Sequence, residues 1–259
     1  MMWIDTHTHL FLPEFKEDIQ EVIDRATAAN VRKMLLPNIH AASVKPLKHL
    51  CDRFSDCLIP MMGLHPCYVN ESWETELETI REELEKNTNT YCAVGEIGID
   101  LYWDKTYREQ QKQVFQTQLK WAKQLHKPVA IHVRNAFDEV FEIIEKEIDE
   151  NLKGVFHCFT GNKTQAERIL SYQSFYFGIG GVVTFKNAGV DKVVKDIPLE
   201  KIVLETDSPY LAPVPYRGKR NESSFIPFIA KKLAEIKNVD IETVARQTTL
   251  NAQKLFNVS

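Results

Sequence analysis

The sequence alternates short apolar runs with amphipathic stretches that have the period of a helix, and this alternation repeats eight times. The apolar runs end near residues 7, 37, 63, 96, 132, 157, 180 and 207. Consecutive ends lie about 30 residues apart, which is room for one strand, one helix and two short loops. Continuous apolar strands that alternate with helices predict a parallel sheet with both faces buried.

The same periodicity places the individual elements. We expect strands over residues 2–5, 31–37, 57–64, 92–97, 129–133, 154–159, 176–183 and 201–206. We expect helices near residues 15–26, 43–54, 75–85, 106–126, 137–148, 164–172 and 190–196, and two more after residue 224. Thr75 with Glu78, and Thr106 with Glu109, have the spacing of capping boxes at helix starts.

Eight strand–helix units in a chain of 259 residues favour a closed (β/α)8 TIM barrel. No linker rich in Gly, Ser or Pro divides the chain, so we expect one domain over residues 1–259. A doubly wound open sheet is the alternative, because the pattern does not itself encode closure. The first strand is not followed by G-x-G-x-x-G, which argues against a Rossmann nucleotide site.

Composition narrows the setting in which such a fold would work. No apolar run reaches the roughly 18 residues that a membrane span needs, and the chain turns polar at Asp5, too early for a signal peptide. Five cysteines without paired spacing suit a reducing compartment. A net charge of −4 argues against non-specific coating of nucleic acid, yet it leaves room for a local basic groove.

Residues of metal-ligand type stand at the carboxyl ends of five predicted strands. They are His7 and His9 after the first strand, Glu96 on the fourth, His132 on the fifth, His157 on the sixth and Asp207 on the eighth. The carboxyl ends of barrel strands share one face, where barrel active sites are built. A single strand-end His or carboxylate is more often a satisfied polar group or a helix cap. Six on one face predict a metal site.

The chemistry of the six residues favours two ions. His7 and His9 are two apart in extended backbone, so both point to one side and can hold one ion. Six ligands are too many for one catalytic zinc, and Glu96 comes from a strand between the two groups of histidines. We therefore expect Glu96 to bridge two divalent ions, either Zn²⁺, Mg²⁺ or Mn²⁺. A hydroxide shared by the ions would attack, with Asp207 taking the proton.

The sequence resembles the TatD family of metal-dependent hydrolases. The motifs that carry the resemblance run in family order over Ile4–Leu10, Gly63–Pro66, Gly95–Asp100, Ile131–Arg134, Phe156–Gly161, Leu204–Pro213 and Arg217–Glu222. The resemblance implies an amidohydrolase-type TIM barrel with a divalent-metal site on the same six residues. It implies a phosphodiesterase, usually described as a deoxyribonuclease that acts from the 3′ ends of DNA, and a cytoplasmic location.

The departures from the family pattern leave the six ligand positions intact. Val133 and Asn135 flank Arg134 where the family usually has Ser and Asp. Tyr216 precedes the Arg217 motif, and Ser223 stands where Pro often follows Asn-Glu. These changes bear on substrate contacts rather than on the metal site.

A phosphodiester substrate needs positive charge where negative charge develops in the transition state. We expect His65, Arg134 and Arg217 to bind it, since arginine suits bidentate phosphate contacts. Arg217 begins a basic loop after the eighth strand, which a solvated surface run would also explain.

Aromatic residues in the same loops have two readings. Tyr102, Trp103, Phe159 and Tyr210 either stack exposed bases of single-stranded DNA or pack against the barrel mouth.

Two other functions fit the same pattern. An amide, ester or lactone hydrolase would use the same binuclear site, although Arg134 and the basic loop favour phosphate. A non-catalytic binding protein would be expected to have lost ligands, and all six are present. The expected partner is therefore DNA, as single strands or 3′ ends, with no membrane partner and with a monomeric chain.

Overall fold

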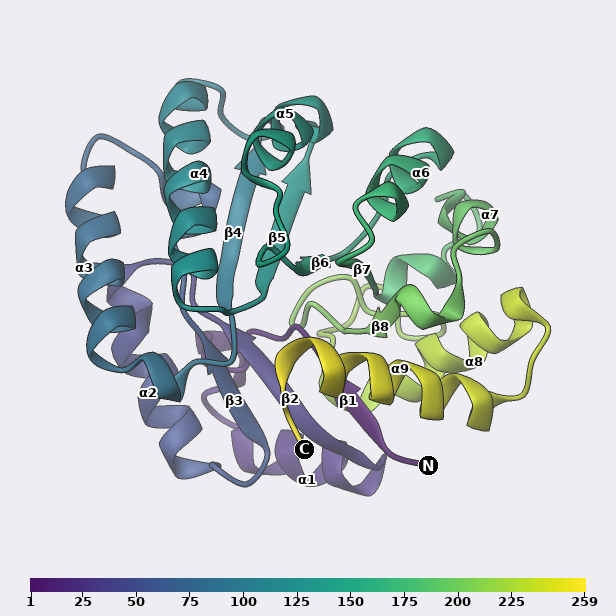
Figure 1. Cartoon of the computed structure of the whole chain (residues 1–259). Coiled ribbons are helices and arrows are strands. Elements are labelled where there is room, and N and C mark those ends of the chain that lie inside the picture. The colour runs from purple at the N-terminus through teal and green to yellow at the C-terminus, as the bar shows by residue number, and fades with distance from the viewer.

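The computed structural model describes residues 1–259, and its centre is a set of eight parallel strands (Figure 1). The strands are β1 (Trp3–Asp5), β2 (Val31–Pro37), β3 (Leu58–Met61), β4 (Val94–Asp100), β5 (Val129–Arg134), β6 (Gly154–Phe156), β7 (Phe175–Ile179) and β8 (Ile202–Leu204). They pair in sequence order, β1 to β3 in one sheet and β4 to β8 in a second sheet. A doubly wound sheet would reverse its order, and no reversal occurs.

Backbone hydrogen bonds join the two sheets at both of their edges. Between β3 and β4, Met62 pairs with Val94 in parallel. Between β8 and β1, the Thr6 N–H donates to the Leu204 carbonyl at 3.0 Å. Beyond these strands, Thr8 pairs in parallel with Ser208. The ring is thereby continuous, and the predicted TIM-barrel fold is confirmed.

The helices lie outside the strands (Figure 1). They are α1 (Ile19–Ala28), α2 (Val44–Arg53), α3 (Trp73–Lys86), α4 (Arg108–Gln124), α5 (Phe137–Glu147), α6 (Lys163–Ser171), α7 (Val190–Val194), α8 (Ile226–Lys237) and α9 (Ile241–Phe256). Helix α1 shows why, because its buried residues Ile19, Val22, Ile23 and Ala26 form one apolar stripe. None of the helices combines the length and the apolar character that crossing a membrane requires.

Both predicted capping boxes are wrong. Helix α3 already begins at Trp73, and α4 begins only at Arg108. Before α4, the Asp104 carboxylate accepts the Thr106 N–H at 2.8 Å, which holds this residue in a turn instead of at a helix start.

The seventh strand is also shorter than predicted. It ends at Ile179, and Gly181–Thr184 form a 3₁₀ turn where the sequence predicted more strand. Gly181 opens that turn, and a Cβ atom on it would lie 2.0 Å from the Leu211 carbonyl oxygen, so only glycine fits where the segment after β8 approaches.

One apolar cluster fills the barrel interior and extends onto α9. It contains one residue from each of the eight strands or its immediate end, together with four residues from the α9 region: Ile4, Leu35, Met61, Ala93, Ala130, Val155, Tyr176, Val203, Ala252, Leu255, Phe256 and Val258. A second, larger cluster packs the strands against the surrounding helices. Helix α9 therefore closes one end of the barrel with apolar side chains, and the carboxyl ends of the strands are left for polar groups.

Candidate metal centre

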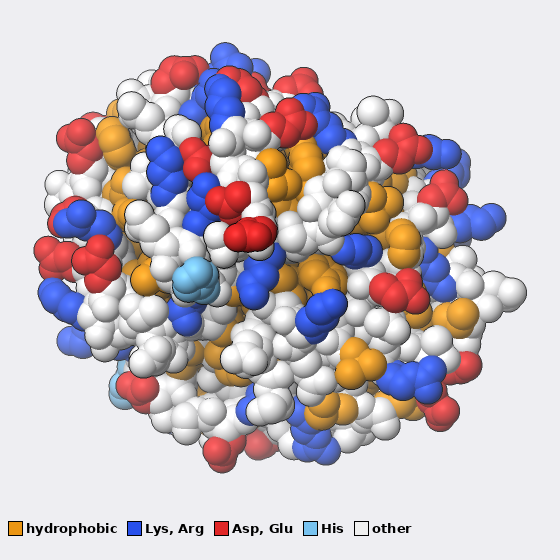
Figure 2. Space-filling view, in the orientation of Figure 1, with side chains coloured by type: hydrophobic (Ala, Val, Ile, Leu, Met, Phe, Trp, Pro, Cys, Tyr) orange, Lys and Arg blue, Asp and Glu red, His pale blue; other side chains and the backbone are white.

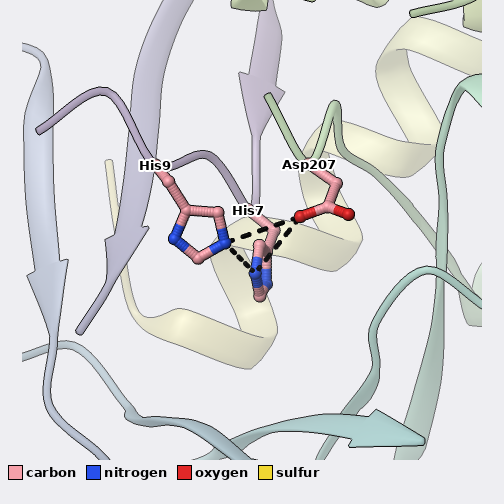
Figure 3. Close-up of side chains that lie close together, drawn as sticks. All are labelled: His7, His9 and Asp207. Atoms are coloured by element: carbon pink, nitrogen blue, oxygen red, sulfur yellow. Dashed lines mark hydrogen bonds and ion pairs between the residues drawn. The ribbon is translucent and has the colours of Figure 1, made fainter. Parts of the chain in front are cut away.

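His7 and His9 follow β1 and meet Asp207, which follows β8 (Figure 3). Their Nε2 atoms lie 3.3 Å apart. Asp207 Oδ1 lies 3.9 Å from Nε2 of His7 and 3.5 Å from Nε2 of His9. The two imidazoles and the carboxylate therefore converge on one point, from chain positions separated by nearly the whole barrel.

Ring closure is what brings these segments together. The Asp207 N–H donates to the His7 carbonyl at 2.9 Å, and the His9 N–H donates to the Ser208 carbonyl at 2.8 Å. The hydroxyls of Thr8 and Ser208 are 2.5 Å apart and share a hydrogen bond. The alternation of extended backbone sends the side chains of His7 and His9 to one side, while Thr8 faces the neighbouring segment.

Glu96 stands at the centre of the site, within β4. Its Oε2 lies 3.1 Å from Nε2 of His7 and 3.4 Å from Nε2 of His9. Its Oε1 lies 3.0 Å from Nδ1 of His132 and 2.9 Å from Nε2 of His157. The two oxygens of one carboxylate thus face two groups of imidazoles, which adjoin where the rings of His7 and His157 stack with centroids 3.8 Å apart.

His65 joins the second of these groups. Its Nε2 is 3.2 Å from Oε1 of Glu96, and its ring centroid is 4.5 Å from that of His132. The sequence motif suggested a substrate contact for His65, whereas its position also makes it a further nitrogen donor beside Glu96.

Two acidic residues that the sequence analysis did not single out support the histidines. Asp100 Oδ2 accepts a hydrogen bond from Nε2 of His132 at 2.9 Å, because a carboxylate can only accept. Glu205 Oε1 lies 3.4 Å from Nδ1 of His157. Such outer carboxylates orient the rings of metal-binding histidines. The available signal was an acidic residue at the end of an apolar strand, close to a residue already selected.

Glu205 is fully buried and fits tightly against its surroundings. Its Oε1 accepts the Cys158 N–H at 2.5 Å. A Cβ atom on Gly178 would lie 2.1 Å from Oε2 of Glu205, so only glycine leaves space for this carboxylate. Gly178 in β7 therefore leaves the space that the Glu205 side chain occupies.

The pKa values of two buried carboxyls, Glu96 and Asp5, are shifted in opposite directions. Burial alone would raise the pKa of Glu96, but the adjacent imidazoles of His65 and His157 outweigh it and hold that pKa well below its usual range. Burial raises the pKa of Asp5 to about 7, because the hydrogen bonds from Thr206, Ser223 and His7 do not offset the cost of burying its charge. The surrounding imidazoles thus keep Glu96 ionised, because they favour its negatively charged form.

The other charged groups of the site follow the same rule. Burial opposes ionisation of Asp207, yet its hydrogen bond with His9 lowers the pKa of this carboxyl. Burial disfavours the charged form of His157, yet Glu96 and Glu205 together raise the pKa of this imidazole well above its usual value. The site therefore attracts positive charge.

These residues fit divalent cations on observations of the structure itself. Neither Lys nor Arg forms an ion pair with Glu96, Asp207 or Glu205; their charged partners are histidines. Glu205 Oε2 is buried without a hydrogen-bond partner. Three sets of potential ligand atoms each lie within 4.8 Å of one another: His7, His9 and Asp207; His7, His157 and Glu205; His65, Glu96 and His132. Imidazole and carboxylate together are the donors that first-row divalent ions prefer.

A cavity of about 660 Å³ opens above these groups. Of the residues predicted to bind substrate, His65 and Arg134 line it. Arg217 does not, because its guanidinium lies over the Phe185 ring at 4.0 Å. The basic loop runs along α1 instead, since Arg220 pairs with Asp18 at 2.6 Å. The structure therefore does not bring Arg217 to the cavity.

The predicted aromatic residues divide between the two readings. Phe159 is buried and packs edge-to-face against Phe177, so stacking on a base is wrong for this residue. Trp103 and Tyr210 line the cavity and are exposed, and Tyr102 stands exposed next to Trp103. Away from the cavity, the face in Figure 2 intersperses acidic and basic side chains without a broad field of either sign.

A barrel with buried histidines and carboxylates at the carboxyl ends of its strands defines the class of metal-dependent hydrolases. Comparison with known sequences agrees, because the model of the family described as TatD related DNase matches residues 4–257. The chain belongs to the TatD family, and the resemblance read from its motifs is confirmed.

Individual relatives cover essentially the whole chain. YabD of Bacillus subtilis, described as an uncharacterized metal-dependent hydrolase, is 37% identical over 259 residues, which is all of both chains. YcfH of Escherichia coli, described in the same words, is 31% identical over all of this chain and 97% of its own. The crystal structure of the TatD homologue YjjV from Escherichia coli superimposes with a TM-score of 0.93 at 30% identity, over 99% of this chain and 98% of its own.

Proposed function

We propose that this hydrolase is a divalent-metal-dependent deoxyribonuclease that removes nucleotides from the 3′ ends of DNA. The observation that carries the proposal is the juxtaposition within one cavity of ionised carboxylates and a cationic wall residue. Glu96 and Asp207 at the floor call for metal cations, and Arg134 in the wall suits a phosphate that those cations bind.

Six residues would hold two ions. His7, His9 and Asp207 would hold one, His132 and His157 would hold the other, and Glu96 would lie between them, with one carboxylate oxygen toward each group. When bound, two divalent cations activate water near neutral pH and neutralise charge on a phosphate. Zn²⁺, Mg²⁺ and Mn²⁺ all suit this donor set.

The remaining steps fall to side chains of the chain itself. Asp207 is ionised and faces the shared space, so it is placed to accept the proton of the attacking water. Arg134 binds and orients the phosphate from the cavity wall. His65 Nε2 points to the floor beside Glu96, where it can donate to a substrate oxygen.

The proposed location is the cytoplasm. All five cysteines are free thiols, which supports a reducing compartment. Within that compartment the proposed partner is DNA with an accessible 3′ end, and the chain acts as a monomer.

End-labelled oligonucleotides test this function directly. Protein stripped of metal and reloaded with Mg²⁺, Mn²⁺ or Zn²⁺ is given single-stranded DNA labelled at its 5′ end, with or without a 3′-terminal phosphorothioate block. We expect progressive shortening from the 3′ end with at least one metal, and arrest by the block. Glu96→Gln serves as the inactive variant, and Glu85→Gln, on the exposed face of α3, as the matched control.

A different result would overturn the proposal. Intact DNA under every metal, together with turnover in a panel of amides, esters and lactones, would make the protein a hydrolase of those bonds. Cleavage that ignores the 3′ block would make it an endonuclease.

A further inference from the structure

Asp207 begins a tight turn over residues 207–210, which we call the Asp207 turn. Within it, the Tyr210 N–H donates to the Asp207 carbonyl at 2.9 Å. Asp207 has a left-handed backbone with φ +56°, and so does Leu211 just after the turn, with φ +55°. Residues other than glycine adopt this conformation at a cost in free energy, so contacts from elsewhere in the chain must hold it.

The side chain of Asn221 bridges the two ends of the Asp207 turn. Its Nδ2 donates one hydrogen bond to the Thr206 carbonyl and one to the Tyr210 carbonyl, both at 2.7 Å. Its backbone N–H donates to the Pro209 carbonyl at 3.0 Å. Asn221 is fully buried, so solvent does not replace these hydrogen bonds when they are lost.

The residues on either side of Asn221 fasten it to α1. Arg220 donates two hydrogen bonds to the carboxylate of Asp18, at 2.6 and 2.8 Å. On the other side, Arg25 donates to both oxygens of the Glu222 carboxylate, at 2.8 and 2.6 Å. Paired contacts between a planar guanidinium and a carboxylate fix orientation as well as distance. The amide of Asn221 therefore holds the turn from a fixed place.

The Asp207 turn builds one of the two groups of metal ligands. Its carboxylate Oδ1 lies 3.5 Å from Nε2 of His9 (Figure 3). The Ser208 carbonyl in the same turn accepts the His9 N–H at 2.8 Å. A shift of the turn would therefore displace a carboxylate and an imidazole together. In the other group, His132 lies on β5 and His157 follows β6, and neither is hydrogen-bonded to the turn.

We propose that Asn221 is a positioning residue for Asp207, and that it acts through the backbone carbonyls at the two ends of the turn. It directs the carboxylate toward His7 and His9 without itself contacting metal or substrate. This inference rests on the two-ion site of the proposed function. It adds that one ion depends on the loop after β8, whereas the other does not.

Metal binding tests this role without any hydrolysis. Protein stripped of metal is titrated with Zn²⁺ in competition with a chelator, which gives the number of ions and the affinity of each. Asn221→Ala removes the bridging amide without adding charge. We expect it to weaken one ion about 10- to 100-fold and to leave the other at wild-type affinity.

A second variant and a control protect this test against effects on folding. Asn221→Asp keeps the shape of the side chain, but an ionised carboxylate can only accept and so cannot bridge two carbonyls. It should show the same selective loss if Asn221→Ala does not fold. Phe256→Ala truncates a buried side chain of α9 at the apolar end of the barrel, and should bind both ions as the wild type does.

A double-mutant cycle asks whether the effect passes through Asp207. In an Asp207→Asn background, the Asn221 substitution should change Zn²⁺ affinity by about twofold at most, because the ligand that it positions is already lost. In a His132→Asn background, it should still cost its full 10- to 100-fold. A residue that only supported the fold would cost the same in both backgrounds.

The outcomes separate the role of Asn221 from the nuclease function. Equal weakening of both ions, unchanged affinity for both, or a loss that persists in full beside Asp207→Asn overturns the proposal. A selective loss that disappears in that background supports it. Uptake of a single ion by the wild type would count against the two-ion site, and the cycle with Asp207→Asn would still decide the role of Asn221. Because Zn²⁺ alone is the probe, absence of DNA hydrolysis counts against the nuclease function only.

Discussion

Both ends of the barrel interior hold buried side chains, but those side chains are apolar at one end and polar at the other. At one end, Leu255 and Phe256 of α9 cover apolar residues such as Ile4 and Val203. At the other end, the barrel interior holds ionised Glu96 among imidazoles. Apolar burial stabilises the fold at the first end, whereas burial of a carboxylate costs free energy that a bound cation recovers at the second. The fold therefore separates stability from chemistry along the barrel axis.

Removing the central carboxylate should have the largest effect at the polar end. Glu96→Gln should lower hydrolysis about 1000-fold or more, since the proposed two-metal site would lose its shared carboxylate and with it several kcal/mol of charge stabilisation. Circular dichroism should show a folded barrel. Metal content is measured on the same sample, and turnover at the wild-type rate with metal bound would contradict the role assigned to Glu96.

Truncating an apolar side chain of α9 at the closed end of the barrel should lower stability instead of activity. Phe256→Ala should lower the free energy of unfolding by about 3–5 kcal/mol, because it removes a buried ring and leaves a cavity. Urea denaturation measures the change. Leu250→Ala, on the exposed side of α9, should stay within about 0.5 kcal/mol of wild type. A Phe256→Ala protein that keeps its stability would show that α9 does not close the barrel.

The outer carboxylates should have an intermediate effect, confined to the polar end. Asp100→Asn and Glu205→Gln should each weaken metal binding about 10- to 100-fold, because His132 and His157 lose the groups that orient their rings. Competition with a chelator measures the affinity. Glu85→Gln should leave the metal affinity unchanged. Equal metal affinities in all three variants would show that neither Asp100 nor Glu205 supports metal binding.

The smallest effect on stability concerns an ion-pair group at the start of α1, where Asp18 pairs with Arg220 and Arg25. The hydrogen bond from Arg220 lowers the pKa of Asp18 to about 2, so the pair stabilises the fold above the unfolded pKa near 4 and loses this contribution as pH falls toward 2. Because Asp18 is partly exposed, Asp18→Asn should cost about 1 kcal/mol or less at pH 7.

Denaturation of both proteins between pH 7 and pH 3 measures this difference. The gap between wild type and Asp18→Asn should narrow as the solution is acidified. A gap that stays constant would place the effect of the substitution outside the ion pair.

Sequence periodicity predicted the barrel and the meeting of its strand ends well. His7, His132 and His157 each follow an apolar run, and parallel pairing alone brings such positions to one face. The path of a long loop is a different matter. Arg217 was expected at the cavity, but the pairing of Arg220 with Asp18 directs that loop along α1, and a contact between residues so far apart leaves no local pattern.

The supporting carboxylates show a second reason for the difference. The role of Glu205 depends on a neighbour in space, Gly178, whose missing side chain makes room for it. Neither residue has a periodicity or spacing that relates it to the other. Likewise, Phe159 and Trp103 look equivalent as aromatic loop residues, and only packing distinguishes the buried ring from the exposed one.

The backbone bonds that join His7 to Asp207 have a consequence for biosynthesis. A ribosome releases the chain in order, so His7 and His9 emerge long before β8 and the carboxylate beyond it. Until that strand takes its place beside β1, the first group of donors lacks Asp207 and the ring stays open. A fragment that lacks β8 therefore cannot assemble the site, and hydrolytic competence becomes a property of nearly completed chains only.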